Sequence, residues 1–118
     1  MKFKFNRMNR VSKELVGASA SPFILSLLKQ GDSYGYEIVQ KVKELTSGEI
    51  KWQEASIYPV LKKLESQGMI KSYWRVQEGE RPRKYYTLQR EGINMLEAKQ
   101  HDWKLVQSVF AKLWNFNI

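Results

Sequence analysis

The chain has no cysteine, three prolines and a single histidine among its 118 residues. Without cysteine it has no disulfides, no thiolate metal ligands and no cysteine nucleophile, and it suits a reducing compartment. No apolar run approaches the roughly 18 to 20 residues that span a membrane, and no continuous apolar segment follows the basic start of the chain. We therefore expect a small cytoplasmic protein with one hydrophobic core, no membrane contact and no signal peptide.

Patterns typical of catalytic and metal sites are also missing. His101 is the lone histidine, and its neighbour Asp102 points in a different direction if both residues lie on a helix. The glycines Gly31, Gly35 and Gly48 lack the spacing of a phosphate-binding loop. We therefore expect that the chain is not an enzyme, and that it has no catalytic residues, no metal ligands and no cofactor.

Positive charge is plentiful and unevenly distributed. The chain has 20 lysines and arginines against 12 acidic residues, a formal net charge of +8. Residues 1–13 hold five basic and no acidic residues, and residues 71–90 hold six basic and two acidic ones. Two basic segments around a near-neutral body are typical of a protein that touches a phosphate backbone at more than one place. A solvated tail and a soluble hairpin are the alternative.

Apolar stripes that end at glycine predict three helices in the first part of the chain. Ser21 is the expected N-cap of the first, with Pro22 in its first turn, and a longer helix from about Val11 is the alternative. Pro59 is unfavourable inside the third helix, but it is acceptable if Ser56 is the N-cap and Pro59 falls in the first turn. The three helices are expected over about residues 21–30, 33–45 with Ser33 as a cap, and 54–67.

The hydrophobic period then changes from 3.6 to 2, which predicts strands over residues 69–76 and 83–88. The turn residues between them make the pair a hairpin, which must pack against the helices because two strands alone are marginally stable. Tyr85 and Tyr86 alternate along the second strand, so one of them should point inward. Trp52 and Trp74 are expected to pack against the protein rather than to stack on bases.

A last helix is expected from Arg90 to about Trp114. A helix of about 24 residues is roughly 36 Å long, which exceeds what so small a body can cover. Its apolar stripe needs a partner, and we expect a second copy of the chain. The residues expected at this homodimer interface are Leu96, Trp103, Val106, Phe110 and Leu113.

Three helices followed by a hairpin are the order of a winged helix-turn-helix, an α+β, mainly helical fold. In that fold the third helix enters the major groove of DNA and the hairpin lies along the backbone. We expect a basic N-terminal arm over residues 1–10, a DNA-binding domain over 11–89 and a dimerisation helix over 90–118. A dimeric winged-helix module that binds a protein, and RNA binding by the arm and the hairpin, remain as alternatives.

Several segments resemble the PadR-like family of transcriptional regulators. In order they are SPFILSLLKQG at 21–31, YGYEI at 34–38, ASIYPVLKKLESQGMI at 55–70, RPRKYYTL at 81–88 and EG at 91–92. Each segment is common by itself, but their order and spacing are specific, and the resemblance covers about residues 13–114. It implies a homodimeric bacterial repressor that binds a pseudo-palindromic operator in double-stranded DNA. Gln89 stands where the family commonly has a capping threonine.

The resemblance also implies roles for individual residues. Ser56 and Tyr58 match DNA-contacting positions at the start of the family's third helix, and Tyr36 matches a tyrosine near the DNA backbone. Phosphate contacts are implied for the lysines of the third helix and the basic residues of the hairpin, which are Lys62, Lys63, Arg81, Arg83 and Lys84.

Trp103 lies in the middle of the last helix, on the stripe expected to form the dimer. In some PadR-like multidrug sensors, similar tryptophans of the two subunits sandwich flat aromatic ligands, and an aromatic face attracts planar rings and cations. The resemblance therefore implies a planar aromatic small molecule that binds at Trp103 and releases the repressor. The alternative is that Trp103 belongs to the dimer core and holds no ligand.

Overall fold

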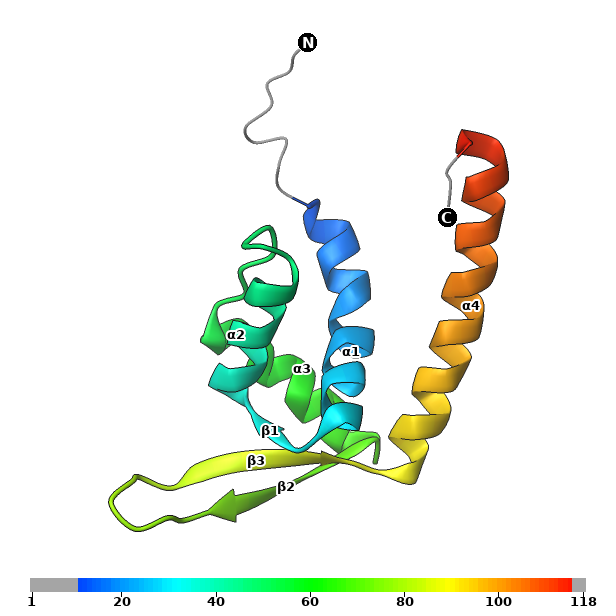
Figure 1. The fold of residues 1–118 in the computed structure, drawn as a ribbon. Helices are drawn as coiled ribbons and strands as arrows, with labels where there is room; N and C mark the ends of the chain where they lie inside the picture. Colours follow the sequence, from blue (N-terminus) through cyan, green and yellow to red (C-terminus); the bar gives the residue numbers. More distant parts are fainter. Residues whose placement is uncertain (1–10, 116–118) are drawn as a thin grey trace.

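The computed structural model describes residues 11–115 and folds them into a mainly helical body with a small antiparallel sheet at one end (Figure 1). The expected fold class, a winged helix-turn-helix with a long C-terminal helix, is confirmed. The predicted basic arm, residues 1–10, lies outside the described residues. In chain order the elements are α1 (Lys13–Gln30), β1 (Ser33–Tyr34), α2 (Gly35–Leu45), α3 (Glu54–Ser66), β2 (Ile70–Arg75), β3 (Arg83–Leu88) and α4 (Arg90–Trp114).

The hydrophobic core forms where α1, α2 and α3 meet. Each helix buries the apolar positions that recur every three or four residues on one face. Removal of this apolar surface from water is the main favourable contribution to folding. Residues from β2, β3 and α4 close the core from the side of the sheet. The core side chains are Ile24, Leu25, Leu27, Leu28, Ile38, Val39, Val42, Ile50, Ile57, Leu61, Leu64, Ile70, Tyr86 and Leu96.

The first helix begins earlier than its expected start. Ser12, not Ser21, is the N-cap of α1, and its hydroxyl oxygen accepts a hydrogen bond from the backbone N–H of Leu15 at 3.2 Å. The expected cap at Ser21 is therefore wrong, and the longer helix is right. Pro22 lies inside α1, where its missing N–H leaves the carbonyl of Ala18 without a helical donor. The helix continues because its apolar residues beyond Pro22 are fixed in the core.

The second helix starts two residues after its expected start, and the third starts where it was expected. Ser33 lies in β1 instead of capping α2, and its side chain donates a hydrogen bond to Glu37 of the first turn. The third helix begins at Glu54, as expected, with Gln53 as its N-cap, so Ser56 lies inside the helix and does not cap it. In consequence Pro59 lies in the second turn of α3, where it removes one helical donor.

The sheet has three strands in the order β1-β3-β2, whereas the sequence predicted a two-stranded hairpin. The short strand β1 pairs antiparallel with β3, and this pairing attaches the hairpin to the helical body. The hairpin of β2 and β3, called the wing here, extends beyond the helices at the bottom of Figure 1. The expectation for the two tyrosines is confirmed, because Tyr86 is buried at 3% exposure and Tyr85 lies on the opposite face.

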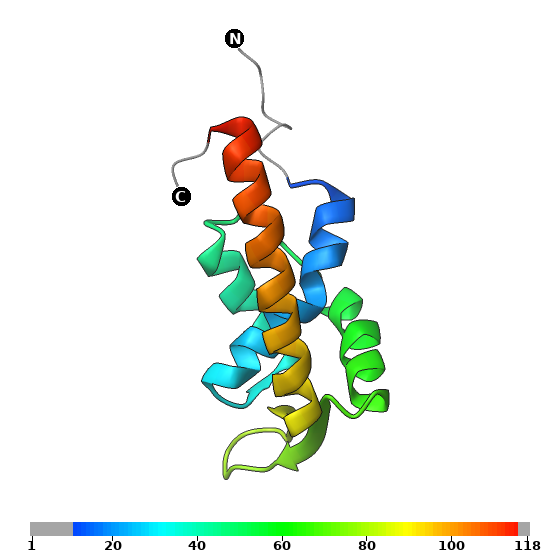
Figure 2. The ribbon, with the colours of Figure 1, turned by 90° about the vertical axis from the view of Figure 1, so that its right-hand side faces the viewer.

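The last helix follows its predicted bounds and leaves the body after its first turns. Figure 2 shows α4 running along the molecule in front of α1, and in Figure 1 its distal half rises away from α1. Leu96, which its spacing placed on the dimer stripe, is buried in the chain's own core at 2% exposure. Within residues 11–115, no helix combines the length and the hydropathy that a membrane span needs.

The base of α4 is held by a close backbone approach at Gly92. A side-chain carbon at this position would lie 2.2 Å from the carbonyl oxygen of Met69 and 2.6 Å from Leu88. The N–H of Gln89 donates to the same Met69 carbonyl at 2.9 Å. A glycine is therefore required where α4 crosses the start of β2.

We predict that Gly92→Ala lowers the free energy of unfolding by at least about 2 kcal/mol, because the backbone of Met69 must move to admit the methyl group. Gly17→Ala is the matched control, since a side-chain carbon at Gly17 of α1 meets nothing within 4 Å. That substitution should stabilise the helix by about 0.5 to 1 kcal/mol. Urea denaturation followed by circular dichroism measures the free energy of unfolding of both variants. The prediction is contradicted if Gly92→Ala is no less stable than Gly17→Ala.

Candidate nucleic-acid interface

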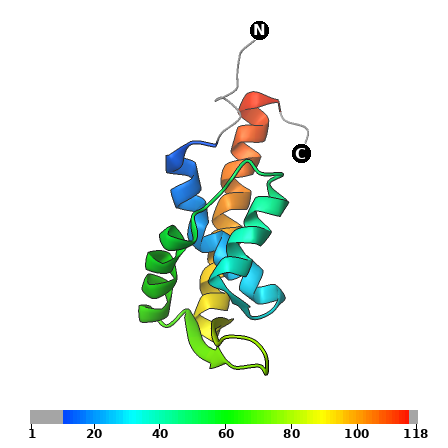
Figure 3. The same ribbon diagram turned by 90° about the vertical axis from the view of Figure 1, so that its left-hand side faces the viewer.

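The third helix has one buried and one polar side. Its apolar residues Ile57, Leu61 and Leu64 face the core. Figure 3 shows α2 and α3 on the side of the molecule away from α4, with the wing beneath them. The four residues of α3 that the sequence assigned to DNA are all exposed on its outer side, namely Ser56, Tyr58, Lys62 and Lys63.

Tyr58 is exposed at 42% yet fixed in place by α2 and by its own helix. Its hydroxyl donates a hydrogen bond to a carboxylate oxygen of Glu54 at 3.0 Å, one turn earlier. Partial burial and this hydrogen bond raise the pKa of the Tyr58 phenol. A side-chain carbon on Gly35 would lie 2.8 Å from the Tyr58 hydroxyl oxygen, so the start of α2 lies directly against the Tyr58 side chain. Tyr36, the next residue of α2, is exposed at 50%.

The basic residues of the wing were predicted as one set of phosphate contacts, but the structure divides them between the two faces and the turn of the wing. Arg81 lies exposed in the turn between β2 and β3. The Arg83 guanidinium lies 4.5 Å from the centre of the Tyr34 ring, so β1 and β3 hold this charge by a cation–π contact. Lys84 points to the opposite face of β3 and is exposed.

The outer face of the sheet, turned away from the helices, is a cluster of aromatic rings. Tyr85 packs against Tyr34, with ring centres 5.1 Å apart, and against Tyr73 at 5.9 Å. The Tyr73 hydroxyl donates to a carboxylate oxygen of Asp32 at 2.6 Å and accepts from Arg75 at 3.3 Å. This hydrogen bond to Asp32 raises the pKa of Tyr73. The cluster fastens the wing to the loop before β1.

The inner face of the sheet is bonded directly to α3. Both the backbone N–H and the hydroxyl of Ser72 in β2 donate to one carboxylate oxygen of Glu65 in α3, at 3.2 and 2.6 Å. Because these bonds are part-buried, they are shielded from competition with water. The third helix and the wing therefore form one connected unit.

The basic side chains of α3 and the wing form no ion pairs with the acidic side chains of residues 11–115. Across residues 11–115 no lysine or arginine lies within ion-pair distance of a carboxylate; His101 and Asp102, 3.7 Å apart, are both highly exposed on α4. Lys62 and Lys63 of α3 and Lys84 of the wing are exposed and form no ion pair with any described residue. Their charge remains available to an anionic partner.

The distal half of α4 exposes the remaining residues of the predicted dimer stripe. Trp103 is exposed at 41%, and Phe110 stacks on Trp114 with ring centres 4.2 Å apart. Single exposed apolar residues are ordinary, but a stripe along one helix marks an interaction surface. The exposed apolar residues of this half are Trp103, Leu105, Val106, Val109, Phe110, Leu113 and Trp114.

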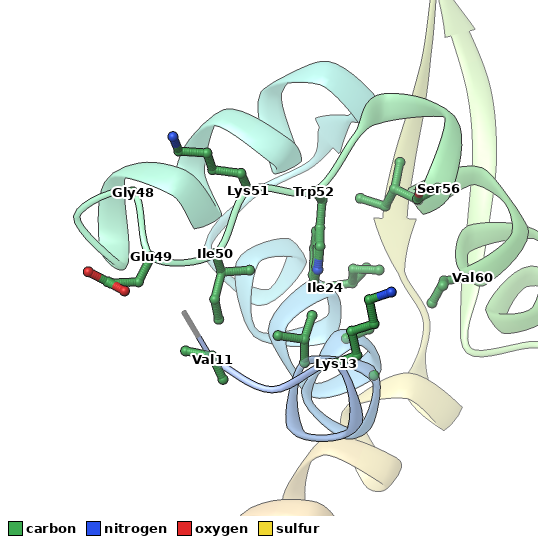
Figure 4. Close-up of a pocket in the computed structure, with 14 residues that line it drawn as sticks. Val11, Lys13, Ile24, Gly48, Glu49, Ile50, Lys51, Trp52, Ser56 and Val60 are labelled. Atoms are coloured by element: carbon green, nitrogen blue, oxygen red, sulfur yellow. The ribbon is translucent and has the colours of Figure 1, made fainter. Parts of the chain in front are cut away.

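A pocket of about 690 Å³ that the sequence analysis missed lies between α1, the α2–α3 loop and α3 (Figure 4). Its wall is mainly apolar, and Ser56 and Val60 bring α3 into its lining. Trp52 forms part of the wall and packs against Phe23, with ring centres 6.0 Å apart, so the expected packing role of Trp52 is confirmed. Among the described residues no cluster of three acidic, histidine or cysteine side chains could hold a metal ion.

Comparisons with known proteins agree on one family. The model of the transcriptional regulator PadR-like family matches residues 24–98. A solved transcriptional regulator from Clostridium thermocellum is 34% identical to this chain. The match covers 86% of this chain and 96% of that regulator, with a TM-score of 0.78. Bacillus subtilis PadR, solved in complex with operator DNA, is 35% identical, covers 70% of this chain and 45% of its own, and has a TM-score of 0.59. The negative transcriptional regulator PadR of Bacillus subtilis is 36% identical over 80 matched residues. The match covers 68% of this chain and 42% of that protein.

We predict that the free energy of unfolding falls as the pH rises above about 10, and that Tyr73→Phe reduces this fall. The raised pKa of Tyr73 means that the unfolded chain loses this proton first. The stability from the Asp32 bond is therefore present below pH 10 and is lost as the pH rises through the folded pKa. Urea denaturation at about pH 8 and about pH 10.5 measures the difference, with Tyr36→Phe as the matched control. Equal falls in wild type and Tyr73→Phe argue against the prediction.

Proposed function

The chain belongs to the PadR-like family of transcriptional regulators, and from this premise we propose that it is a homodimeric repressor of bacterial genes. It is a transcriptional regulator and not an enzyme, in agreement with the sequence analysis. In this proposal each α3 enters a major groove of the operator and each wing holds the flanking backbone. Two-fold symmetry then gives a pseudo-palindromic operator with half-sites about 34 to 36 Å apart. The protein acts in the cytoplasm, where bacterial DNA is found.

The observation that carries the DNA-binding proposal is the pair of exposed lysines on α3, without counter-charges, beside a basic wing. Lys62 and Lys63 lie on the side of α3 opposite its core residues. Ser56 and Tyr58, nearer the N-terminus of the helix, offer a hydroxyl and a phenol to base edges, and Tyr36 lies exposed on α2 for the backbone. Bacillus subtilis PadR, 35% identical to this chain, was solved in complex with operator DNA, which supports DNA as the partner.

The homodimer rests on the exposed stripe of α4. A helix of 25 residues is about 37 Å long, and only its first part is covered by the chain's own core. We assign Trp103, Val106, Phe110 and Leu113 to the interface with a second copy, and we leave out Leu96 because the chain's own core already buries it. Burial of this stripe against a second copy of the chain removes a large apolar surface from water.

Release of the repressor by a planar aromatic ligand is the finer part of the proposal. Trp103 is partly exposed, so that a symmetric dimer brings two indole faces to the same interface. Facing indoles bind planar and cationic rings by stacking and cation–π attraction. A ligand between them changes the spacing of the two α4 helices and thereby that of the two α3 helices.

A dimeric winged-helix module that binds a protein is the alternative function, and ionic strength separates the two. Contacts with phosphates release counterions, so that affinity falls steeply as the salt concentration rises. An apolar protein interface lacks this dependence. RNA binding differs in its preference for structured RNA over duplex DNA.

We predict that Lys62→Ala and Lys63→Ala each weaken binding to all duplexes and reduce the slope of log affinity against log salt by about one unit. An operator is first selected from random duplex DNA, and fluorescence anisotropy across a salt series then gives the slopes. Lys43→Ala, in the last turn of α2, is the matched control and keeps both affinity and slope. Unchanged affinity and slope in both α3 variants would show that α3 does not face the DNA.

We predict that planar aromatic cations quench the tryptophan fluorescence of the wild type saturably and that Trp103→Ala abolishes this quenching. Light scattering checks that the variant remains a dimer. Trp52→Phe is the control, because Trp52 lines the separate pocket beside α3. Quenching that survives in Trp103→Ala and disappears in Trp52→Phe places the ligand in that pocket and excludes the proposal for Trp103.

A further inference from the structure

The wing carries an exposed tryptophan that neither the core nor the aromatic cluster uses. Trp74 of β2 is exposed at 64%, which corrects the sequence-based expectation that it packs against the protein. The ring–ring contacts of the described sheet join Tyr34, Tyr73 and Tyr85, and Trp74 takes part in none of them. An exposed indole on a basic hairpin presents a large apolar face beside positive charge.

The strand register shows which way Trp74 points. Directly paired residues of antiparallel strands project to the same face. Ile70 pairs with Leu88, and Ser72 pairs with Tyr86, and these pairs face the helices because Ile70 and Tyr86 are buried. The next pair on this face is Trp74 with Lys84. It therefore projects from the inner face of the wing, past the edge of the helical body.

The inner face is also the side on which α3 lies. Ser72, one pair before Trp74 on the same face, donates both of its hydrogen bonds to Glu65 of α3. Trp74 and Lys84 are thus the first residues of this face that extend beyond α3 toward the wing turn. A ligand that covers the outer side of α3 and continues along the wing meets these two side chains next.

On the other face of the wing, both strand arginines lie against tyrosine rings, and Lys71 is exposed at the end of β2 nearest the helices. Arg75 holds its guanidinium 4.0 Å from the centre of the Tyr85 ring, and Arg83 lies 4.5 Å from that of Tyr34. These cation–π contacts occupy both arginines in the tertiary structure. Lys84 is the strand cation that remains on the inner face, with its ammonium 5.9 Å from the Tyr86 ring. Positive charge for a polyanion is therefore available next to Trp74, on the same face of the wing.

We propose that Trp74 and Lys84 form a contact surface for the edge of the minor groove that flanks the site read by α3. The indole packs against deoxyribose groups of one strand, while the Lys84 ammonium lies against the adjacent phosphate. The proposal rests on the proposed DNA-binding function and adds to it a second, mainly apolar contact. Duplex DNA is the occupant favoured by the charge of Lys84 and by the continuity of this face with α3.

This contact makes the wing sensitive to the shape of the flanking DNA. Sugars of the two strands approach each other where the minor groove is narrow, as it is in A-tracts. An indole that packs on these sugars gains more contact in a narrow groove than in a wide one. The operator flanks are therefore read through groove width, although no side chain of the wing bonds to a base there.

The test compares a selected operator with long flanks and the same operator trimmed to the base pairs under the two α3 helices. On the long operator, Trp74→Ala binds about tenfold more weakly than the wild type with an unchanged salt slope. Lys84→Ala binds more weakly with a slope lower by about one unit. On the trimmed operator the Trp74→Ala difference disappears, because the sugars that Trp74 contacts are absent. Leu45→Ala, which removes an exposed apolar side chain from α2, is the matched control and binds like the wild type.

Two outcomes overturn the proposal while leaving DNA binding intact. If the Trp74→Ala variant binds the long operator as tightly as the wild type, the indole makes no contact with DNA. If Trp74→Ala weakens binding to the trimmed operator as much as to the long one, Trp74 acts through the fold or between two copies of the chain. A wild type that binds no duplex in a salt-dependent way is a different result, because it also overturns the proposed function. Thermal unfolding of each variant confirms that the exposed positions tolerate substitution.

Discussion

The antiparallel pairing of β1 with β3 joins the helical body to the wing, and the position of every candidate contact depends on it. The strand β1 runs directly into α2, whose first residue, Gly35, lies against Tyr58 of α3. The strand β3 is the centre of the sheet and contributes both Lys84 and Tyr85. Ser33 is fully buried, so its backbone bonds to β3 are protected from water. A displacement of the wing therefore displaces α2 and α3 with it.

Those features of the fold that rest on long periodic patterns could be predicted from the sequence. The change from a period of 3.6 to a period of 2 locates the hairpin, and the spacing of apolar residues in α4 gives its bounds. The start of α1 was misplaced because both Ser12 and Ser21 have the chemistry of a cap, and only the tertiary packing decides between them. The strand β1 was missed because two residues are too few to show an alternation.

The candidate site was predictable where one helix determines it and less so where several elements meet. The exposed residues of α3 follow from its own apolar stripe, so their placement on one side was foreseen. The division of Arg83 from Lys84 requires knowledge of Tyr34, which reaches the sheet from a distant part of the chain. Leu96 was assigned to the dimer because its stripe continues without a break from the covered to the exposed part of α4. A single sequence does not show where the body ends.

The close approach at Gly92 fixes the first turn of α4 directly against the base of the wing. The carbonyl of Met69, which Gly92 faces, immediately precedes β2, so rotation of α4 at this point presses on the strand that carries Ser72 and Trp74. Trp103 lies eleven residues further along α4, about 16 Å from Gly92 along the helix axis. Because the backbone of Met69 and the first turn of α4 are in direct contact, a change in the tilt of α4 cannot occur without a movement at the start of β2.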